Sequence, residues 1–185
     1  MFIKLSNTFN RLARGWAILI CLSLFILFQI IPDLLFPEAA EAFGPMIHLD
    51  GLIYYTPETA FAAVESYGAA GRTLMVYLHI LWDIPFPLIY TALLSLCISW
   101  LLQRGFPPGS WMLRLNLIPV LGGILDLLEN TFIVILLLTY PSQPVLIARM
   151  SGFATLGKFI SGIVIFALLM VGLTSAARNR FRLEA

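Results

Sequence analysis

Four long and almost uncharged apolar segments constrain the fold of this 185-residue sequence more than any other feature. A transmembrane helix needs roughly 20 mostly apolar residues, because each residue adds about 1.5 Å and the hydrocarbon core is about 30 Å thick. Residues 15–36, 73–102, 113–140 and 152–176 meet this requirement. We therefore predict an all-α, polytopic membrane protein with four transmembrane helices in a bundle.

Composition supports the same fold class. The chain is 60% hydrophobic and 11% charged, whereas a soluble domain carries about a quarter charged residues. The four segments leave an outer loop of residues 37–71 but no room for a soluble domain, so we expect a single integral membrane domain over residues 1–185. The first segment follows a basic stretch, as a signal peptide would, but it exceeds the usual apolar core of about 7–15 residues. An uncleaved helix is favoured.

The distribution of charge predicts the orientation of the chain. Short segments rich in Lys and Arg mark the cytoplasmic side of a membrane protein. Basic residues precede the first segment, follow the second and end the chain, whereas the outer side is mainly acidic and has only Arg72 and Arg149 as basic residues. We predict that both termini are cytoplasmic and that the protein is a multi-pass protein of the inner (plasma) membrane. The basic residues of the cytoplasmic side are Lys4, Arg11, Arg14, Arg104, Arg114, Arg178, Arg180 and Arg182; the acidic ones of the outer side are Glu38, Glu41, Asp50, Glu58 and Glu65.

The outer loop contains the signals of a short amphipathic helix. Thr56 can cap a helix, Pro57 suits its first position, and Glu58 faces the positive end of the helix dipole. Gly68 can end this helix. We expect it to lie on the outer leaflet or across the bundle mouth, with an ordinary structured linker as the alternative. Within the second apolar segment, Pro85 and Pro87 predict a kink.

Ionisable residues inside the apolar segments form the candidate site. Charge inside a bilayer costs several kcal/mol, so such side chains usually face the protein interior and find partners. Helical rise and spacing place them in one layer between the bilayer middle and its outer third, on inward faces. Arg72 and Tyr90 lie on the same face of the second segment as His79 and Asp83. The predicted ligand-binding residues are His79, Asp83, Asp126, Glu129, Asn130 and Lys158, with Tyr90 and Arg72.

The charges of this layer leave several functions open. Three carboxylates face one lysine, so a carboxyl is protonated, a cation is bound, or water enters. We expect a buried acidic pocket for a small or lipid-like ligand. The main alternative is a structural or accessory subunit whose buried charges only fix helix packing. Proton-coupled transport and membrane-embedded acid–base or metal-dependent catalysis are further alternatives.

Other motifs narrow these choices. The sequence has no Gly-x-Ser-x-Gly motif and no Walker or GxGxxG phosphate loop, which disfavours nucleophilic hydrolysis and nucleotide use. Its two histidines do not form the Glu-x-x-His pattern of bundle di-iron sites, so we assign no metal ligand, and the cofactor stays unknown. The partner that we expect is the lipid bilayer, without nucleic acid. Oligomerisation stays open, because transport through four helices would require it.

A family resemblance agrees with this topology. The run Leu49-Asp50-Gly51, then Tyr55-Thr56-Pro57-Glu58 and Ala60, Gly71-Arg72, Asp83 with Pro87 and Tyr90, and Asp126-Leu-Leu-Glu129-Asn130 resembles small uncharacterised bacterial four-helix integral membrane proteins. The resemblance covers about residues 49–158. It implies the topology and no activity. Sterol-isomerase-like four-helix membrane proteins also place acidic residues in a bundle pocket, but no motif links this chain to them.

Overall fold

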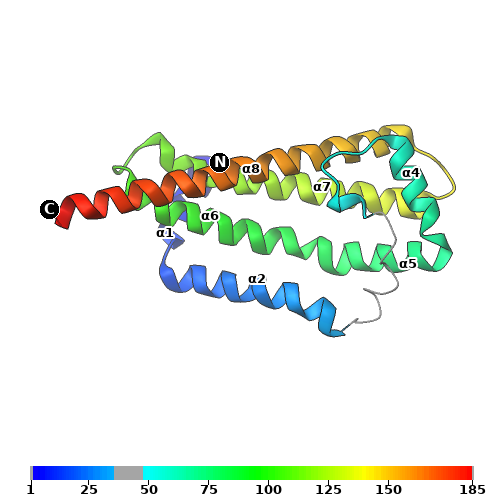
Figure 1. Ribbon diagram of the computed structural model, residues 1–185, viewed down its shortest axis with the longest axis horizontal. Helices are drawn as coiled ribbons and strands as arrows, with labels where there is room; N and C mark the ends of the chain where they lie inside the picture. Colours follow the sequence, from blue (N-terminus) through cyan, green and yellow to red (C-terminus); the bar gives the residue numbers. More distant parts are fainter. Residues whose placement is uncertain (1, 36–47, 185) are drawn as a thin grey trace. The chain divides into compact units, whose positions relative to one another are not determined.

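The computed structural model describes residues 2–35 and 48–184, and these residues form an all-α structure (Figure 1). Short 3₁₀ turns and one π-helical turn connect the longer helices. The helices are α1 (Phe2–Leu12), α2 (Gly15–Leu35), α4 (Pro57–Ser66), α5 (Gly68–Leu78), α6 (Pro85–Gly105), α7 (Ile118–Thr139) and α8 (Val145–Glu184); the turns are η1 (Leu49–Gly51), the π-helical η2 (His79–Asp83) and η3 (Trp111–Leu117).

Three helical segments of the described chain are long and apolar enough to cross a membrane. They are Gly68–Gly105, Trp111–Thr139 and Val145–Phe181, and the bent pair α1–α2 makes a fourth if it counts as one span. The all-α prediction is confirmed, and the long apolar helices support a multi-pass membrane protein. Gly68–Gly105 and Val145–Phe181 extend at both ends beyond the predicted apolar runs 73–102 and 152–176. At about 1.5 Å per residue, the 40 residues of α8 exceed the hydrocarbon thickness.

The chain divides into two compact units. The first unit contains Met1–Phe25, Ile89–Gly122 and Ile160–Ala185, and the second contains Ile26–Leu88 and Gly123–Phe159. The expected single domain stays a prediction. Glu38 and Glu41 of the outer loop lie outside the described residues.

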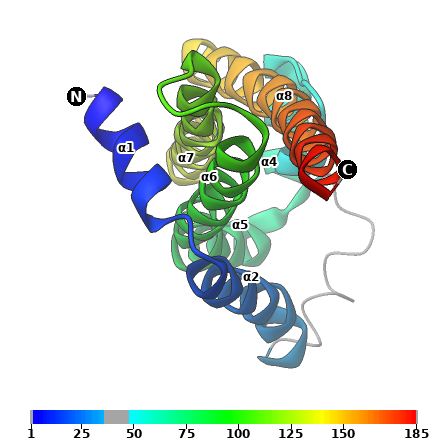
Figure 2. The ribbon, with the colours of Figure 1, turned by 90° about the vertical axis from the view of Figure 1, so that its left-hand side faces the viewer.

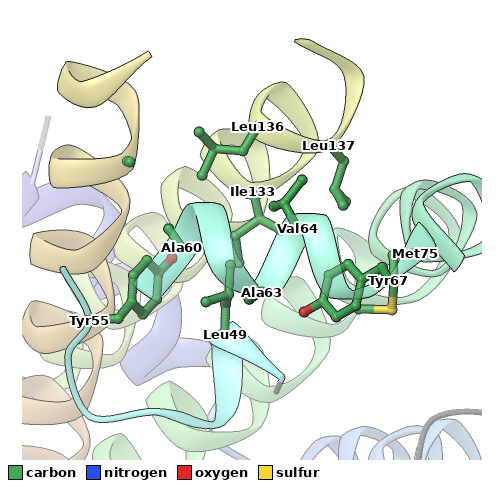
Figure 3. Packing of buried hydrophobic residues seen from close by; sticks show 11 residues of the cluster. Leu49, Tyr55, Ala60, Ala63, Val64, Tyr67, Met75, Ile133, Leu136 and Leu137 are labelled. Atoms are coloured by element: carbon green, nitrogen blue, oxygen red, sulfur yellow. The ribbon is translucent and has the colours of Figure 1, made fainter. Parts of the chain in front are cut away.

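The second unit has its apolar core around α4. Small residues on one face of this helix, Ala60 and Ala63, are fully buried and allow close packing against Ile133 and Leu136 of α7 (Figure 3). Thr56 caps the helix by accepting a hydrogen bond from the backbone N–H of Thr59 at 3.4 Å. The predicted helix of the outer loop is therefore confirmed. Its position on the outer leaflet stays a prediction.

A close approach of two backbones fixes the segment before α4. The Cβ that an alanine would add at Gly152 of α8 would collide with the carbonyl oxygen of Tyr55, so only glycine lets the two segments meet. The Tyr55 hydroxyl is 2.5 Å from the hydroxyl of Ser151. Ser151 and Thr155 are fully buried. Gly162 of the same helix is exposed, because it lies one helical step of about 100° beyond buried Ser161.

A π-helical turn precedes the two prolines of the second apolar segment. The backbone N–H of Ile84 bonds to the carbonyl of His79 at 2.9 Å, one residue further back than in an α-helix. Proline lacks the N–H donor and clashes with the preceding turn, and single π turns are a common way to absorb such a break. The interruption expected from Pro85 and Pro87 therefore takes the form of a widened turn at His79–Asp83.

The first unit begins with an amphipathic helix where the sequence indicated only a basic tail. Helix α1 meets α2 at a bend of 97° (Figure 2). Its buried Ser6 faces the rest of the unit and donates a hydrogen bond to the carbonyl of Leu113 at 3.3 Å. Asn116 of η3, fully buried, donates to the carbonyl of Ser6 at 3.1 Å and to the hydroxyl of Ser99 at 2.8 Å. These bonds hold α1 against η3 and α6.

Candidate functional site

A fully buried carboxylate, Glu129 of α7, lies at the centre of the polar cluster in the second unit. The hydroxyl of Thr155 donates to its Oε1 atom at 2.6 Å, and the ammonium group of Lys158 contacts its Oε2 atom. Lys158 also lies 3.4 Å from the Oδ1 atom of Asp126. Helix spacing explains the arrangement, because Thr155 and Lys158 are three residues apart on α8 and Asp126 and Glu129 are three apart on α7. This part of the cluster is closed.

The second part of the cluster joins α7 to the π-helical turn. Asn130 donates its side-chain amide to the Oδ1 atom of Asp126 at 3.2 Å, and its Oδ1 atom lies 3.2 Å from the Nδ1 atom of His79. That same nitrogen lies 2.9 Å from the carboxylate of Asp83. His79 is 1% exposed, whereas the side chain of Asp83 is 31% exposed. The carboxylate of Asp83 is therefore the accessible end of this chain of contacts.

A missing backbone donor explains why Asn130 reaches the π-helical turn. In a regular helix the N–H of residue 87 would bond to the carbonyl of Asp83, but residue 87 is proline and has no N–H. The amide of Asn130 donates to this carbonyl at 3.0 Å instead. Polar side chains of neighbouring helices often satisfy carbonyl groups that a proline frees inside a membrane. Pro87 thus contributes to the cluster through the acceptor that it leaves.

A small cavity borders the open part of the cluster. Its volume is about 180 Å³, and its lining combines three carboxylates with an ammonium group, two amides and two aromatic rings. The ring of Phe28 stacks on those of Trp82 and Phe86. The distance between ring centroids is 4.2 Å to Trp82 and 6.2 Å to Phe86. The lining residues are Gln29, Asp50, Trp82, Asp83, Phe86, Asp126, Asn130 and Lys158.

Two predicted site residues have other surroundings. The guanidinium of Arg72 lies 3.7 Å over the ring of Tyr140 and donates to the carbonyl of Val64 at 3.4 Å. Tyr90 belongs to the first unit, whereas the other predicted site residues belong to the second. The other six predicted residues share one network of contacts.

Several residues near this network were not predicted from the sequence. Asp50 lines the cavity, and its carbonyl accepts from Lys158 at 3.5 Å. Asp50 was not predicted because it lies in a loop. A loop has no helical periodicity from which the inward direction of a side chain can be inferred. Tyr55 was also missed; burial raises its pKa to about 12, while its hydrogen-bonding contacts with Ser151 and Thr155 oppose that shift. A hydroxyl-rich face on α8 was the one sequence signal for its contact.

The described residues contain no group of three or more His, Cys, Asp or Glu side chains arranged to hold a metal ion. Comparison of the chain with protein-family models, curated proteins and solved structures finds no match. The resemblance to small four-helix membrane proteins therefore stays a prediction.

Proposed function

We propose that this multi-pass membrane protein binds a small, positively charged ligand in the pocket bordered by Asp50, Asp83 and Asp126. The observation that carries this proposal is the excess of carboxylates over cations in one buried cluster. With Glu129 there are four carboxyl groups, and the cationic partners are Lys158 and His79. Uncompensated negative charge in a poorly solvated site is costly, so a ligand bearing an ammonium group would lower the free energy of the cluster.

The division of the cluster supports a cation at the open end. The ammonium group of Lys158 contacts Glu129 and Asp126, whereas the carboxylate of Asp83 is contacted by His79. The faces of aromatic rings attract cations through the ring quadrupole, and Trp82 and Phe86 line the same cavity. A cation there would contact carboxylates on one side and aromatic rings on the other.

The size of the pocket limits the ligand. A cavity of about 180 Å³ is smaller than the 300–1,000 Å³ typical of pockets for drug-sized molecules. It suits a small alkylammonium ion, or the amine headgroup of a lipid-like molecule whose chain remains outside. The proposal therefore concerns the ammonium group, which both ligand classes share.

The orientation follows from the charge distribution. In the proposed topology, four spans form a bundle in the plasma membrane, both termini are cytoplasmic, and the pocket opens towards the outside. Cysteine accessibility tests this arrangement in a variant with Cys21 and Cys97 replaced by alanine. An impermeant maleimide added to intact cells should label Ser142→Cys, in the turn after α7, and not Asn7→Cys in α1. Labelling of both sites, or of Asn7→Cys alone, would contradict the orientation.

A structural role is the second candidate, and the closed part of the cluster favours it. Glu129 is fully buried and is held by Thr155 and Lys158. Buried ion pairs of this kind fix the register of neighbouring elements. The two roles can coexist, because Asp50 and Asp83 border the cavity and Glu129 does not line it.

Fluorescence of Trp82 tests the binding proposal. A variant with Trp16, Trp100 and Trp111 replaced by phenylalanine keeps Trp82 as its reporter next to the cavity. Titration with n-butylammonium should give a saturable change at roughly millimolar concentration, since a ligand of about five non-hydrogen atoms can gain limited binding energy. The same concentrations of n-butanol and butyrate should give no saturable change.

Variants in the same background locate the binding. Asp50→Asn and Asp83→Asn should each weaken n-butylammonium binding about tenfold, as expected when a charge-assisted contact worth about 1.5–3 kcal/mol is lost. Glu65→Gln, an exposed carboxylate of α4 in the same unit, is the matched control and should bind like the parent. Equal responses to the ammonium, alcohol and carboxylate probes would contradict the proposed function. Unchanged binding in both pocket variants would also contradict it.

A further inference from the structure

A groove with basic and apolar walls lies in the first unit, between the C-terminal ends of α6 and α8. Its volume is about 640 Å³, within the range typical of ligand pockets. Arg104 and Arg180 contribute charge, whereas Trp100, Leu173 and Phe181 contribute apolar surface. Leu173 is 52% exposed and Phe181 is 70% exposed. The groove therefore presents cations and a large apolar area to the same occupant.

The contacts between α6 and α8 fix the shape of this groove. The side-chain amide of Asn179 donates to the carbonyls of Arg104 and Gly105 at 3.0 Å each, and so satisfies carbonyls that the end of α6 leaves without a helical donor. A Cβ at Gly105 would lie 2.6 Å from the Cβ of Ser175, so the two helices touch at this point. The walls are thus held by the fold.

The guanidinium of Arg104 lies against the aromatic wall. It is 3.6 Å from the centre of the Trp100 ring, and it donates one hydrogen bond to the carbonyl of Trp100 at 3.0 Å. A guanidinium carries five N–H donors in a planar fork that matches a phosphate group. Stacking on the ring orients this fork. The geometry is suitable for binding an oxyanion at the groove.

A second groove continues the apolar wall. It has a volume of about 360 Å³, shares Trp100 and Leu101 with the first groove, and is completed by Gly15, Ile18, Leu19 and Cys97. All of these residues belong to the first unit, and none of them is charged. The two grooves therefore combine a basic end with an apolar extension along α2 and α6.

We propose that these two grooves bind one anionic phospholipid. Its phosphate would contact Arg104 and Arg180, and an acyl chain would follow the apolar groove past Trp100 and Leu101. A small soluble anion would leave the apolar walls uncovered, and a neutral lipid would bring no net negative charge to the basic end of the groove. Basic pockets between transmembrane helices at the cytoplasmic side bind anionic headgroups in this way, and this end carries the basic residues of the predicted cytoplasmic side. The site is separate from the pocket proposed above and does not depend on it.

Quenching of Trp100 by brominated lipids tests this proposal. A variant with Trp16, Trp82 and Trp111 replaced by phenylalanine keeps Trp100 as the reporter. It is reconstituted in phosphatidylcholine vesicles that contain a fixed minor fraction of either brominated phosphatidylglycerol or brominated phosphatidylcholine. Phosphatidylglycerol should associate with the Trp100 environment several-fold more strongly. Its preference should fall at high ionic strength, because salt screens the attraction between exposed charges.

Arginine variants locate the preference. The double change Arg104→Gln and Arg180→Gln should lower the association ratio of the two lipids to about one. The matched control is Arg114→Gln, an exposed arginine of η3 in the same unit that does not line the groove, and it should keep the parent ratio. Equal quenching by both lipids would overturn the proposal. A complete lack of quenching would also overturn it, because it would show that protein covers the groove. A preference for phosphatidylglycerol that high salt leaves unchanged, in the reporter variant with Arg104 and Arg180 intact, would overturn it as well.

Discussion

The side-chain amide of Asn130 donates a hydrogen bond to the main-chain carbonyl of Asp83 across 3.0 Å. Pro87 creates this acceptor, because it removes the N–H that would otherwise bond to the same carbonyl. The contact ties the widened turn at His79–Asp83 to α7 and aligns the carboxylate of Asp83 with His79. A backbone irregularity is thus coupled directly to the polar cluster.

Asn130→Ala should destabilise the protein, because it leaves the carbonyl of Asp83 without its donor. Loss of a partner for a buried polar group costs about 1–3 kcal/mol. Pro87→Ala restores a backbone donor at the position that bonds to Asp83 in a regular helix. In a double-mutant cycle, Asn130→Ala should therefore cost less in the Pro87→Ala background than in the wild type.

The measurement for this cycle is the fraction of folded protein after heating in detergent, followed by size-exclusion chromatography. Thr131→Ala is the adjacent control, because Thr131 is exposed and its hydroxyl bonds within its own helix to Leu127 at 2.7 Å. Its effect should be small. Additive effects of Asn130→Ala and Pro87→Ala would show that the carbonyl of Asp83 is not shared between these two residues.

The contact between Glu129 and Lys158 makes a second prediction about stability. Lys158→Met leaves the fully buried Glu129 without its ammonium partner, which costs about 3–5 kcal/mol. Glu129→Leu should also destabilise the protein, but less, because it removes the acceptor of Thr155 while Lys158 keeps its contact with Asp126. The double variant should be more stable than Lys158→Met alone, because it removes both charges. Chemical unfolding in mixed micelles measures the free energy of unfolding of each variant. A double variant less stable than both single variants would contradict the pairing.

Gly152→Ala tests the close approach between α8 and the segment before α4. Its Cβ would collide with the carbonyl of Tyr55, and overpacking of this kind costs about 1–3 kcal/mol. Gly162→Ala is a control on the same helix, because open space surrounds its Cβ position. There we expect stabilisation of about 0.5–1 kcal/mol from helix propensity. Thermal melting compares the variants, and equal melting temperatures would mean that Gly152 does not mark a tight contact.

The ionisation of two buried tyrosines predicts how stability depends on pH. Burial raises the pKa of Tyr55 and of Tyr67 from 10 to about 12, and the carboxylate of Asp50 adds to the shift of Tyr67. A pKa that is higher in the folded state favours folding while the phenol is protonated in both states. This contribution is present below about pH 10 and is lost as the pH rises towards about 12.

Absorbance at the tyrosinate band measures this titration. The folded protein should show a step of tyrosine ionisation at a pH above the ordinary range of a phenol. Tyr55→Phe and Tyr67→Phe should each reduce the size of this step, and alkaline unfolding should occur over the same pH range. Completion of all tyrosine ionisation by about pH 10, the ordinary range for a phenol, while the protein stays folded would contradict the buried positions of both hydroxyl groups.

The sequence predicts those features that depend on spacing along one helix. The apolar runs give the long helices, and the steps of three and four residues bring His79 to Asp83 and Asp126 to Asn130. The cap at Thr56 is equally local, because it depends on residues that follow within one turn. These features can be predicted because they depend only on residues that are close together in the sequence.

Contacts that depend on tertiary placement are not predictable in the same way. Asp50 reaches the cavity from a loop, and Tyr55 meets Ser151 because Gly152 permits a close approach. The π-helical turn at His79–Asp83 also interrupts the regular spacing that links Tyr90 to Asp83. Arg72 stacks on Tyr140, an alternative that spacing within one helix cannot reveal. The amphipathic helix α1 was not predicted, because basic residues such as Lys4 and Arg11 mark a cytoplasmic segment in any backbone conformation.

The most direct test of the central claim is a high-resolution structure of the wild-type protein in lipid, determined with and without n-butylammonium. We predict density in the cavity near Asp50, Asp83 and Asp126, present with the ammonium ion and replaced by water without it, while the contacts of Glu129 with Lys158 and Thr155 stay the same. A cavity that contains the same water in both structures, or that closes as Asp50 and Asp83 pair with protein groups, would contradict ligand binding. The buried charges would then serve only to hold the helices together.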